Sequence, residues 1–137
     1  MNFEERIDIK APTEVVFALY SDVDRWASWD PDVKSSSIHG AFATGSIGRL
    51  KPTKGPEAKI VFSEVIPLKS FTVQSKLPLC MMQFEHELAT TAMGTTALHR
   101  VSFSGFLAPI FGRLIGKQIR KGLPKTMAGL KRAAESC

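Results

Sequence analysis

Apolar and polar residues alternate along most of the chain, and helical spacing is confined to two regions near its ends. The alternation over residues 2–10 predicts a β-strand. Pro12 suits a first helical turn, and the apolar residues that follow recur at helical spacing, which predicts a short amphipathic helix over residues 12–21. A second short helix is expected to carry Trp26 and Trp29 on one face. The N-terminal part therefore predicts a strand followed by two short helices.

Strand-like alternation then continues for some seventy residues, interrupted by glycine and proline. The predicted strands cover residues 35–42, 46–52, 57–66, 69–77, 80–91 and 95–105. After Gly105 the apolar residues return to helical spacing, which predicts one long helix from residue 107 to about residue 134. Pro124 lies inside it and is expected to kink it near Lys121.

This order of elements constrains the architecture. Six or seven strands at a spacing of about 4.8 Å make a sheet about 30 Å wide, whereas one helix is only about 10 Å across. One helix cannot cover such a sheet, so the sheet is expected to curl around it. Any space left between the two would be a pocket with apolar walls. The prediction is an α+β fold with a curved antiparallel sheet of six to seven strands around a long C-terminal helix.

Length and composition are those of one globular domain spanning residues 1–137. The chain has 137 residues, of which 44% are hydrophobic and 23% are charged. No apolar run is long enough to span a membrane, and the N-terminus lacks the pattern of a signal peptide. Two cysteines, Cys80 and Cys137, do not make a disulfide framework. We therefore expect a protein of the reducing cytoplasm.

The net charge of +5 is distributed unevenly along the chain. Residues 107–137 contain seven basic residues and one acidic residue, whereas the rest of the chain contains eleven basic and twelve acidic residues. The excess charge thus belongs to one face of the C-terminal helix. No nucleic-acid-binding motif accompanies it, so we expect no nucleic acid partner. The basic face is either simply solvated or makes peripheral contact with an anionic membrane. Binding of such a membrane, or of a partner, through the basic helix is a further alternative function. The sequence leaves the oligomeric state open.

The chain resembles the START/Bet v 1-like superfamily, also called SRPBCC, and its polyketide cyclase/dehydrase-related branch. The resemblance covers essentially the whole chain. It rests on residues 9–17 (IKAPTEVVF), 24–26 (DRW), 29–31 (WDP), 84–86 (FEH), 98–101 (LHRV) and 122–124 (GLP). It implies a helix-grip fold. The superfamily includes lipid carriers, hormone receptors and cyclases, so the resemblance specifies the fold better than the activity.

Hairpin geometry predicts which side chains face the pocket. A tight turn at residues 78–79 pairs His86 with Phe71, and one at residues 93–94 makes His86 and His99 diagonal neighbours. A turn at residues 67–68 places Glu64 on the same face. Trp26 and Trp29 either pack between the short helices and the sheet edge or cover the pocket mouth as lid aromatics. With Trp29 in the second role and Ile115 from the long helix, the predicted ligand-binding residues are Trp29, Phe62, Phe71, Met82, Phe84, His86, His99, Val101, Phe103 and Ile115.

Two functions compete for this pocket. The first is binding, and in a carrier also transport, of a hydrophobic small molecule or lipid. The second is a cofactor-free cyclase or dehydratase that uses His86, His99 and Glu64 as catalytic acids and bases. A purely structural alternative also stands, in which both histidines are satisfied core residues and Glu64 lies at the rim. Whether the protein is an enzyme thus stays open.

No cofactor or metal is expected. Glycine-rich phosphate loops, paired CxxC motifs and an HExxH motif are absent from the sequence. Only two of the three histidines are predicted to share a face, which is too few ligands for a metal ion.

Overall fold

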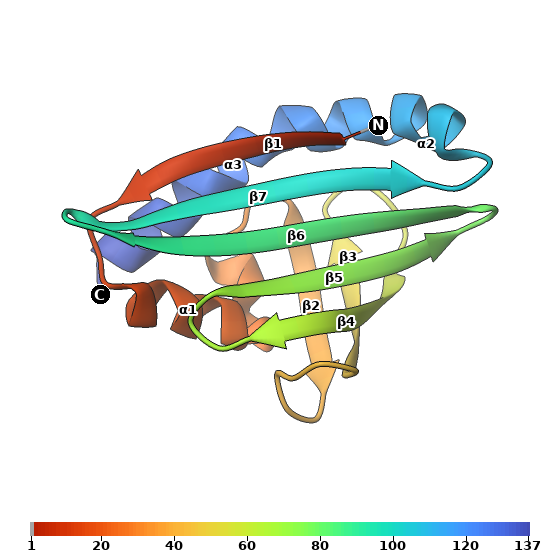
Figure 1. Ribbon diagram of the computed structural model, residues 1–137. Coiled ribbons are helices and arrows are strands. Elements are labelled where there is room, and N and C mark those ends of the chain that lie inside the picture. The colour runs from red at the N-terminus through yellow and green to blue at the C-terminus, as the bar shows by residue number, and fades with distance from the viewer. Residues whose placement is uncertain (1) are drawn as a thin grey trace.

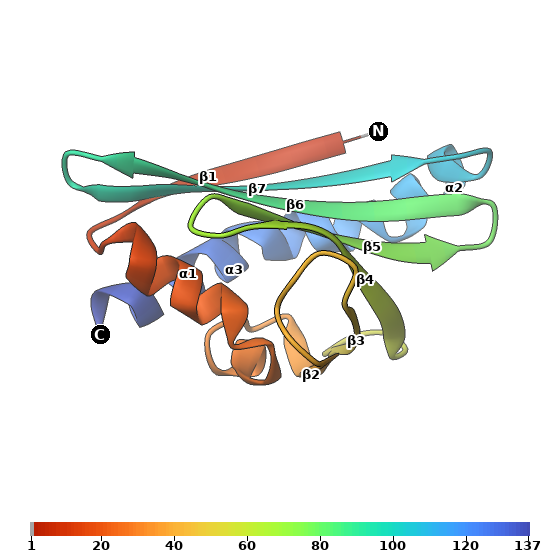
Figure 2. The same cartoon turned by 60° about the horizontal axis from the view of Figure 1, so that its bottom comes forward.

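The computed structural model describes residues 2–137, which form one antiparallel sheet of seven strands with four helical segments (Figure 1). The strands lie in the order β1-β7-β6-β5-β4-β3-β2. The helices α1 and α3 lie on the same side of the sheet, as Figure 2 shows. The strands are β1 (Asn2–Ile9), β2 (Val33–His39), β3 (Ile47–Pro52), β4 (Ala58–Ile66), β5 (Ser70–Leu77), β6 (Cys80–Thr91) and β7 (Gly94–Ser104); the helical segments are α1 (Thr13–Ser21), the 3-10 helix η1 (Val23–Ser28), α2 (Ala108–Leu114) and α3 (Gly116–Glu135).

This arrangement confirms the predicted helix-grip fold, with two short helices after the first strand and a long C-terminal helix. The apolar face of α3 is buried in the interior, as Leu123, Met127 and Leu130 show. Its C-terminal end is fastened to β1, because the Lys131 ammonium donates a hydrogen bond to the Asp8 carbonyl oxygen at 2.8 Å. The helix therefore closes one side of the curved sheet along much of its length. No helix among residues 2–137 is both long enough and apolar enough to span a bilayer.

The C-terminal helix differs from the prediction in two ways. It is divided at Ile115 into α2 and α3, whereas α3 runs through Pro124 without interruption. Leu114 continues the apolar spacing of the predicted helix but is exposed. The regular apolar spacing continues across the division, so periodicity alone could not reveal that α2 turns part of its apolar side outwards.

The β6–β7 hairpin also differs from the prediction, although only by two residues. The turn consists of residues 92–93, and Gly94 already pairs with Thr91. Gly94 has a φ of +143°, and a Cβ there would lie 2.4 Å from the Ile9 carbonyl oxygen. Glycine is thus favoured by its positive φ and by the close approach of the preceding chain, although the residue lies outside the turn. Because the shift is even, every side chain keeps its predicted face. His86 and His99 become directly opposed instead of diagonal.

The predicted inward position of Glu64 is wrong. Phe62 pairs with Val73, but the next regular pair joins Glu64 to Thr72, so β4 contains a β-bulge at residue 63. A bulge adds one residue to one strand and reverses the alternation beyond it. Glu64 therefore lies on the outer face and is exposed. It lies on the face of the sheet opposite the histidines and is excluded from the concave site.

Candidate functional site

Three rings from adjacent strands form a row on the concave face of the sheet. Phe71 on β5 pairs with His86 on β6, which in turn pairs with His99 on β7. The rings of Phe71 and His86 are stacked, with their centroids 3.9 Å apart and an angle of 3° between their planes. The His86 and His99 rings meet edge to face at 4.5 Å. Direct cross-strand pairing thus brings both predicted histidines into contact.

Tyr20 on α1 covers this row from the helical side. Its hydroxyl lies 2.7 Å from Nε2 of His99, and its ring contacts those of Phe71 and His86 edge-on. Helix α1 is held over the sheet by hydrogen bonds at its N-terminus, where Thr95 Oγ1 donates to the Ala11 carbonyl oxygen at 2.8 Å. This hydrogen bond fixes the start of α1 against the sheet, and the helix then carries Tyr20 over the row of rings.

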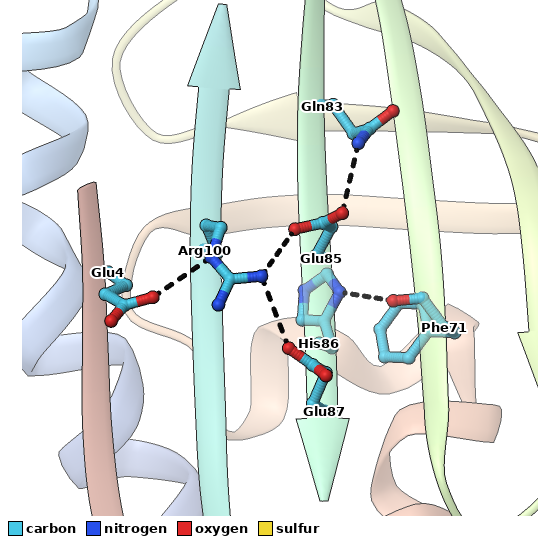
Figure 3. Close-up of polar contacts among 7 residues, drawn as sticks. All are labelled: Glu4, Phe71, Gln83, Glu85, His86, Glu87 and Arg100. Atoms are coloured by element: carbon cyan, nitrogen blue, oxygen red, sulfur yellow. Dashed lines mark hydrogen bonds and ion pairs between the residues drawn. The ribbon is translucent and has the colours of Figure 1, made fainter. Parts of the chain in front are cut away.

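Hydrogen bonding fixes the tautomer of His86. Its Nδ1 lies 3.1 Å from the carbonyl oxygen of Phe71, as the close-up in Figure 3 shows. A carbonyl oxygen can only accept, so Nδ1 carries the proton and donates. The neutral ring then has an unprotonated Nε2. Within residues 2–137 no hydrogen bond engages that Nε2 atom, which leaves His86 with one acceptor for an incoming group.

Burial keeps all three polar rings uncharged. Desolvation lowers the pKa of His86 to about 4, against a smaller opposing contribution from the hydrogen bond to Phe71. The pKa of His99 lies well below its usual value, first because of desolvation and second because of the neighbouring His86. Desolvation also raises the pKa of the Tyr20 hydroxyl. At neutral pH the site therefore offers hydrogen bonds without a formal charge.

The predicted ligand-binding residues fall into two apolar clusters. Trp29, Phe62 and Phe71 belong to one cluster, together with Tyr20. The second cluster contains Met82, Val101, Phe103 and Ile115. Phe84 packs against both clusters and connects them. The interior is therefore continuous along the sheet.

Accessibility differs from strand to strand within this interior. On β5 and β7 the inward residues Phe71, Val73, Val101 and Phe103 are buried. On β6 between them, the inward residues remain half-buried; they are Met82, Phe84, His86 and Leu88. A strand in the middle of a sheet would normally be the most thoroughly covered on its apolar face. The concave side of β6 is thus the most accessible part of the predicted site.

Trp29 lies inside the structure and not at its surface. It is buried in the first cluster beside Tyr20, with their ring centroids 6.1 Å apart. Its Nε1 donor is buried without a hydrogen-bond partner among the described residues. The neighbouring Trp26 does have one, since its Nε1 donates to the Tyr20 carbonyl oxygen at 2.9 Å. Trp29 therefore leaves one hydrogen-bond donor unused in the core.

Two surface hollows lie away from this site. One of about 260 Å³ lies between β2 and β3, and one of about 410 Å³ lies beside the β6–β7 turn and Lys131. Neither is lined by a predicted ligand-binding residue. Among residues 2–137, no group of three histidine, cysteine or carboxylate residues is arranged to hold a metal ion.

Tyr20 is the residue of this site that sequence reasoning missed. The amphipathic helix predicted over residues 12–21 includes it without giving it a place at the site. The signal was present, because this is the only tyrosine in the chain and it falls at a core position. A buried tyrosine hydroxyl usually needs a hydrogen-bond partner, and the two inward histidines were the obvious partners.

Solved structures share this architecture. The protein MLL2253 from Mesorhizobium loti is 18% identical and superposes with a TM-score of 0.79, covering 97% of this chain and 96% of that chain. The di-domain ARO/CYC StfQ from the steffimycin biosynthetic pathway is 14% identical, with a TM-score of 0.79 over 98% of this chain and 50% of that chain. Ara h 8.0201 is 14% identical, with a TM-score of 0.69 over 97% of both chains. At these identities the likeness shows the fold, which is that of the Bet v 1-like helix-grip proteins.

The sequence defines the family more narrowly. Residues 1–135 match the model of the family described as polyketide cyclase / dehydrase and lipid transport, and the chain belongs to that family. No curated protein matches the chain significantly. The family supports binding of a hydrophobic ligand or a cyclase-type activity, and it includes both kinds of function in its description.

Proposed function

We propose that this protein binds a hydrophobic small molecule or lipid against the concave side of β6, with His86 as its polar contact. The observation that carries the proposal is the half-burial of Met82, Phe84, His86 and Leu88 on a central strand whose neighbours are buried. Apolar walls with one well-placed polar group are the usual composition of a small-molecule site. The family's description, which includes lipid transport, supports the same class of ligand.

The polar end of the ligand is a hydrogen-bond donor in this proposal. The unprotonated Nε2 of His86 can accept a hydrogen bond, whereas Nδ1 already donates one to the Phe71 carbonyl oxygen. A hydroxyl group on an otherwise apolar molecule meets this requirement, whereas a carboxylate would bring an uncompensated charge next to two neutral imidazoles. We place this activity in the cytoplasm, since neither Cys80 nor Cys137 is in a disulfide.

The binding test uses Nile red, a neutral apolar dye whose emission rises in apolar surroundings. Met82→Trp would fill the accessible side of β6 and is expected to weaken dye binding about tenfold or more. Gln83→Trp is the matched control, because the adjacent residue faces the outer side of the same strand and should leave binding nearly unchanged. Equal loss in both variants, or no dye binding by the wild-type protein, would argue against the site.

Catalysis is the second candidate, and the contact between His86 and His99 is the observation that favours it. Cyclisation of a polyketide requires removal of a proton beside a carbonyl group and later loss of water. His86 Nε2 would act as the base in such a reaction. Because Glu64 lies on the outer face of the sheet, the only carboxylate predicted as a catalytic residue is not available for this reaction.

The low proton affinity of His86 favours binding over catalysis. A pKa of about 4 makes His86 a weaker base than free imidazole by about 3 kcal/mol, and a general base works best when its pKa is close to the operating pH. We therefore place binding first. Incubation with a poly-β-ketone, followed by detection of an aromatic product, tests the alternative. A product that disappears in the His86→Gln, His99→Gln variant, with Nile red binding retained, would make the protein an enzyme.

A further inference from the structure

The β5–β6 turn meets α2 at one end of the molecule (Figure 1). Both segments expose apolar side chains there. Phe106 is 84% exposed and Leu114 is 72% exposed. Leu79 in the turn and Ile110 on α2 are also exposed. Ile110 and Leu114 are four residues apart and lie on one side of α2, and Phe106 lies in the turn just before this helix. Together Leu79, Phe106, Ile110 and Leu114 form a surface that we call the apolar cap.

The backbone holds the apolar cap in place. Leu107 N–H donates to the carbonyl oxygen of Leu79 at 3.0 Å, which joins α2 to the β5–β6 turn. Gly105 allows this approach, since its φ is +108° and a Cβ there would lie 2.8 Å from the Leu79 oxygen. On the inner side of α2, Ala108 and Gly112 are buried. The helix is therefore anchored by small residues on one side and turns its large apolar residues outwards.

Five cations lie on the elements beside the apolar cap. They are exposed and come from the β3–β4 loop, the end of β5, α2 and the first half of α3; they are Lys54, Lys76, Arg113, Lys117 and Lys121. Lys54 belongs to this group because its carbonyl oxygen accepts a hydrogen bond from Gln118 Nε2 at 3.4 Å.

Two acidic residues lie near these cations: Glu57 follows Lys54 by three residues and pairs with Arg49, and the Asp32 carboxylate lies against Gly122, next to Lys121. Residues 73–82 and 103–134 contain no aspartate or glutamate. Among residues 2–137, the ion pairs of the structure involve other cations, and none of these five side chains takes part in one. The end of the molecule is therefore apolar at its tip and positively charged around it.

We propose that the apolar cap docks this protein onto an anionic lipid membrane. The four apolar side chains would enter the boundary between headgroups and acyl chains, and the surrounding cations would contact the lipid phosphates. Both features match an anionic bilayer. A nucleic acid would use the cations and leave the apolar side chains in water, whereas an apolar protein surface would leave the cations without partners. The proposal also gives a role to the exposed apolar residues of the cap, which are not part of the basic face predicted for the C-terminal helix.

Docking is independent of the ligand proposed above. The ligand site lies on β6 inside the molecule and is tested in solution, without vesicles. Membrane docking is tested with vesicles and without ligand. Failure of one proposal therefore leaves the other standing.

Co-sedimentation measures docking, using vesicles of phosphatidylcholine alone and of equimolar phosphatidylcholine and phosphatidylglycerol. The wild-type protein is expected to bind the mixed vesicles, more weakly as salt rises. Phe106→Ser with Leu114→Ser removes apolar contact, and Lys117→Glu with Lys121→Glu reverses charge. Each pair is expected to weaken binding about tenfold or more.

Matched controls come from the opposite end of the molecule, where the β4–β5 and β6–β7 turns lie (Figure 1). Met93→Ser in the β6–β7 turn removes an apolar side chain that is 69% exposed. Lys69→Glu in the β4–β5 turn reverses an exposed charge. Both controls are expected to bind like the wild-type protein. Equal weakening by the controls would overturn the assignment of docking to the cap, as would equal binding to neutral and mixed vesicles at every salt concentration.

Insertion is measured separately. Phe106→Trp places an indole in the cap, and the native Trp26 and Trp29 are buried. Vesicles that contain brominated phosphatidylcholine are expected to quench this variant more than the wild-type protein. The quenching measurement uses only Phe106→Trp, which replaces one exposed aromatic side chain with another and leaves the core unchanged. Absence of extra quenching would exclude insertion. A dimer in vesicle-free solution that the Phe106→Ser, Leu114→Ser variant dissociates would show instead that the cap joins two copies of the chain.

Discussion

The two faces of strand β6 carry hydrogen-bonding residues in very different surroundings. On the outer face, Arg100 donates to carboxylate oxygens of Glu85 at 2.9 Å, Glu4 at 3.0 Å and Glu87 at 3.4 Å, as Figure 3 shows. These hydrogen bonds raise the pKa of Arg100, and all four side chains keep substantial contact with solvent. On the inner face His86 is the polar group, with one hydrogen bond to a backbone oxygen.

The two faces differ in whether water can take the place of a lost hydrogen-bond partner. If an outer ion pair is removed, water can solvate the remaining groups, so exposed pairs contribute little to stability. On the inner face Phe71 and His99 are buried and His86 is half-buried, so water replaces a lost partner there less readily. A charge placed on these rings carries a desolvation cost. The four predictions below test this contrast, beginning with the largest effect.

Phe71→Ala is expected to destabilise the protein by about 3–5 kcal/mol, because it removes a fully buried ring that stacks on His86. Thr72→Ala, the next residue on the outer face of β5, should change stability by about 0.5 kcal/mol or less. Urea unfolding of both variants gives the comparison. Similar losses in the two variants would contradict the distinction between the faces.

Acidification should destabilise the protein through His86. Its pKa is about 4 when folded and about 6.5 when unfolded. Between these values the unfolded chain binds a proton that the folded protein does not, so the free energy of unfolding falls as pH falls from about 6.5 to 4. The contribution of His86 is up to about 3 kcal/mol, and His99 acts in the same direction.

Asp30 acts in the opposite direction and must be separated from this effect. Burial raises its pKa to about 6, against 3.8 in its usual range. As pH falls between these values the folded protein gains the proton, so the Asp30 contribution increases stability. Urea unfolding of His86→Gln across this pH range isolates the imidazole. A variant whose stability falls with pH as steeply as that of the wild-type protein would refute the assignment.

Tyr20→Phe is expected to cost about 1–3 kcal/mol, because it leaves buried His99 Nε2 without its hydrogen-bond partner. Ser21→Ala is the control, since its hydroxyl bonds to the Ala18 carbonyl oxygen in an exposed position. Thermal unfolding compares them. If the two losses were equal, the hydroxyl of Tyr20 would have no special role.

Glu85→Gln should have the smallest effect, about 1 kcal/mol or less, although it removes the shortest ion pair of the outer network. Arg100 retains Glu4 and Glu87 as partners. Raising the salt concentration should reduce this effect further, since exposed ion pairs are screened. A loss above that of Tyr20→Phe would reverse the proposed order of the two faces.

The fold could be predicted because it depends on features that the sequence shows directly. Alternation and the placement of glycine and proline indicate each strand, and all seven strands form. The β5–β6 register was predicted correctly from the turn at residues 78–79, which pairs Leu77 with Cys80. Both histidines therefore occupy the expected face.

The details that were missed depend on contacts between distant segments. Gly94 lies in β7 and not in the turn, and a Cβ there would meet the Ile9 carbonyl oxygen, which comes from a segment far away in sequence. The bulge in β4 does show in the sequence, because the charged Glu64 stands where regular alternation would place an apolar residue, whereas the division at Ile115 breaks no rule of apolar spacing. Tyr20 reaches His99 only because α1 crosses the sheet at that point. Such contacts follow from the packed structure and leave little trace in one sequence.

The bulge at residue 63 has a consequence for comparing family members. Beyond it, the inward residue of β4 is Val65, which pairs with Phe71, and not Glu64. A relative with a regular β4 would carry its apolar residue one position earlier. Aligned without a gap, the two sequences would show a charged residue against an apolar one and suggest a difference in the binding site. A one-residue gap at Ser63 would remove that disagreement, and the inward residues of the two strands would then be compared with each other.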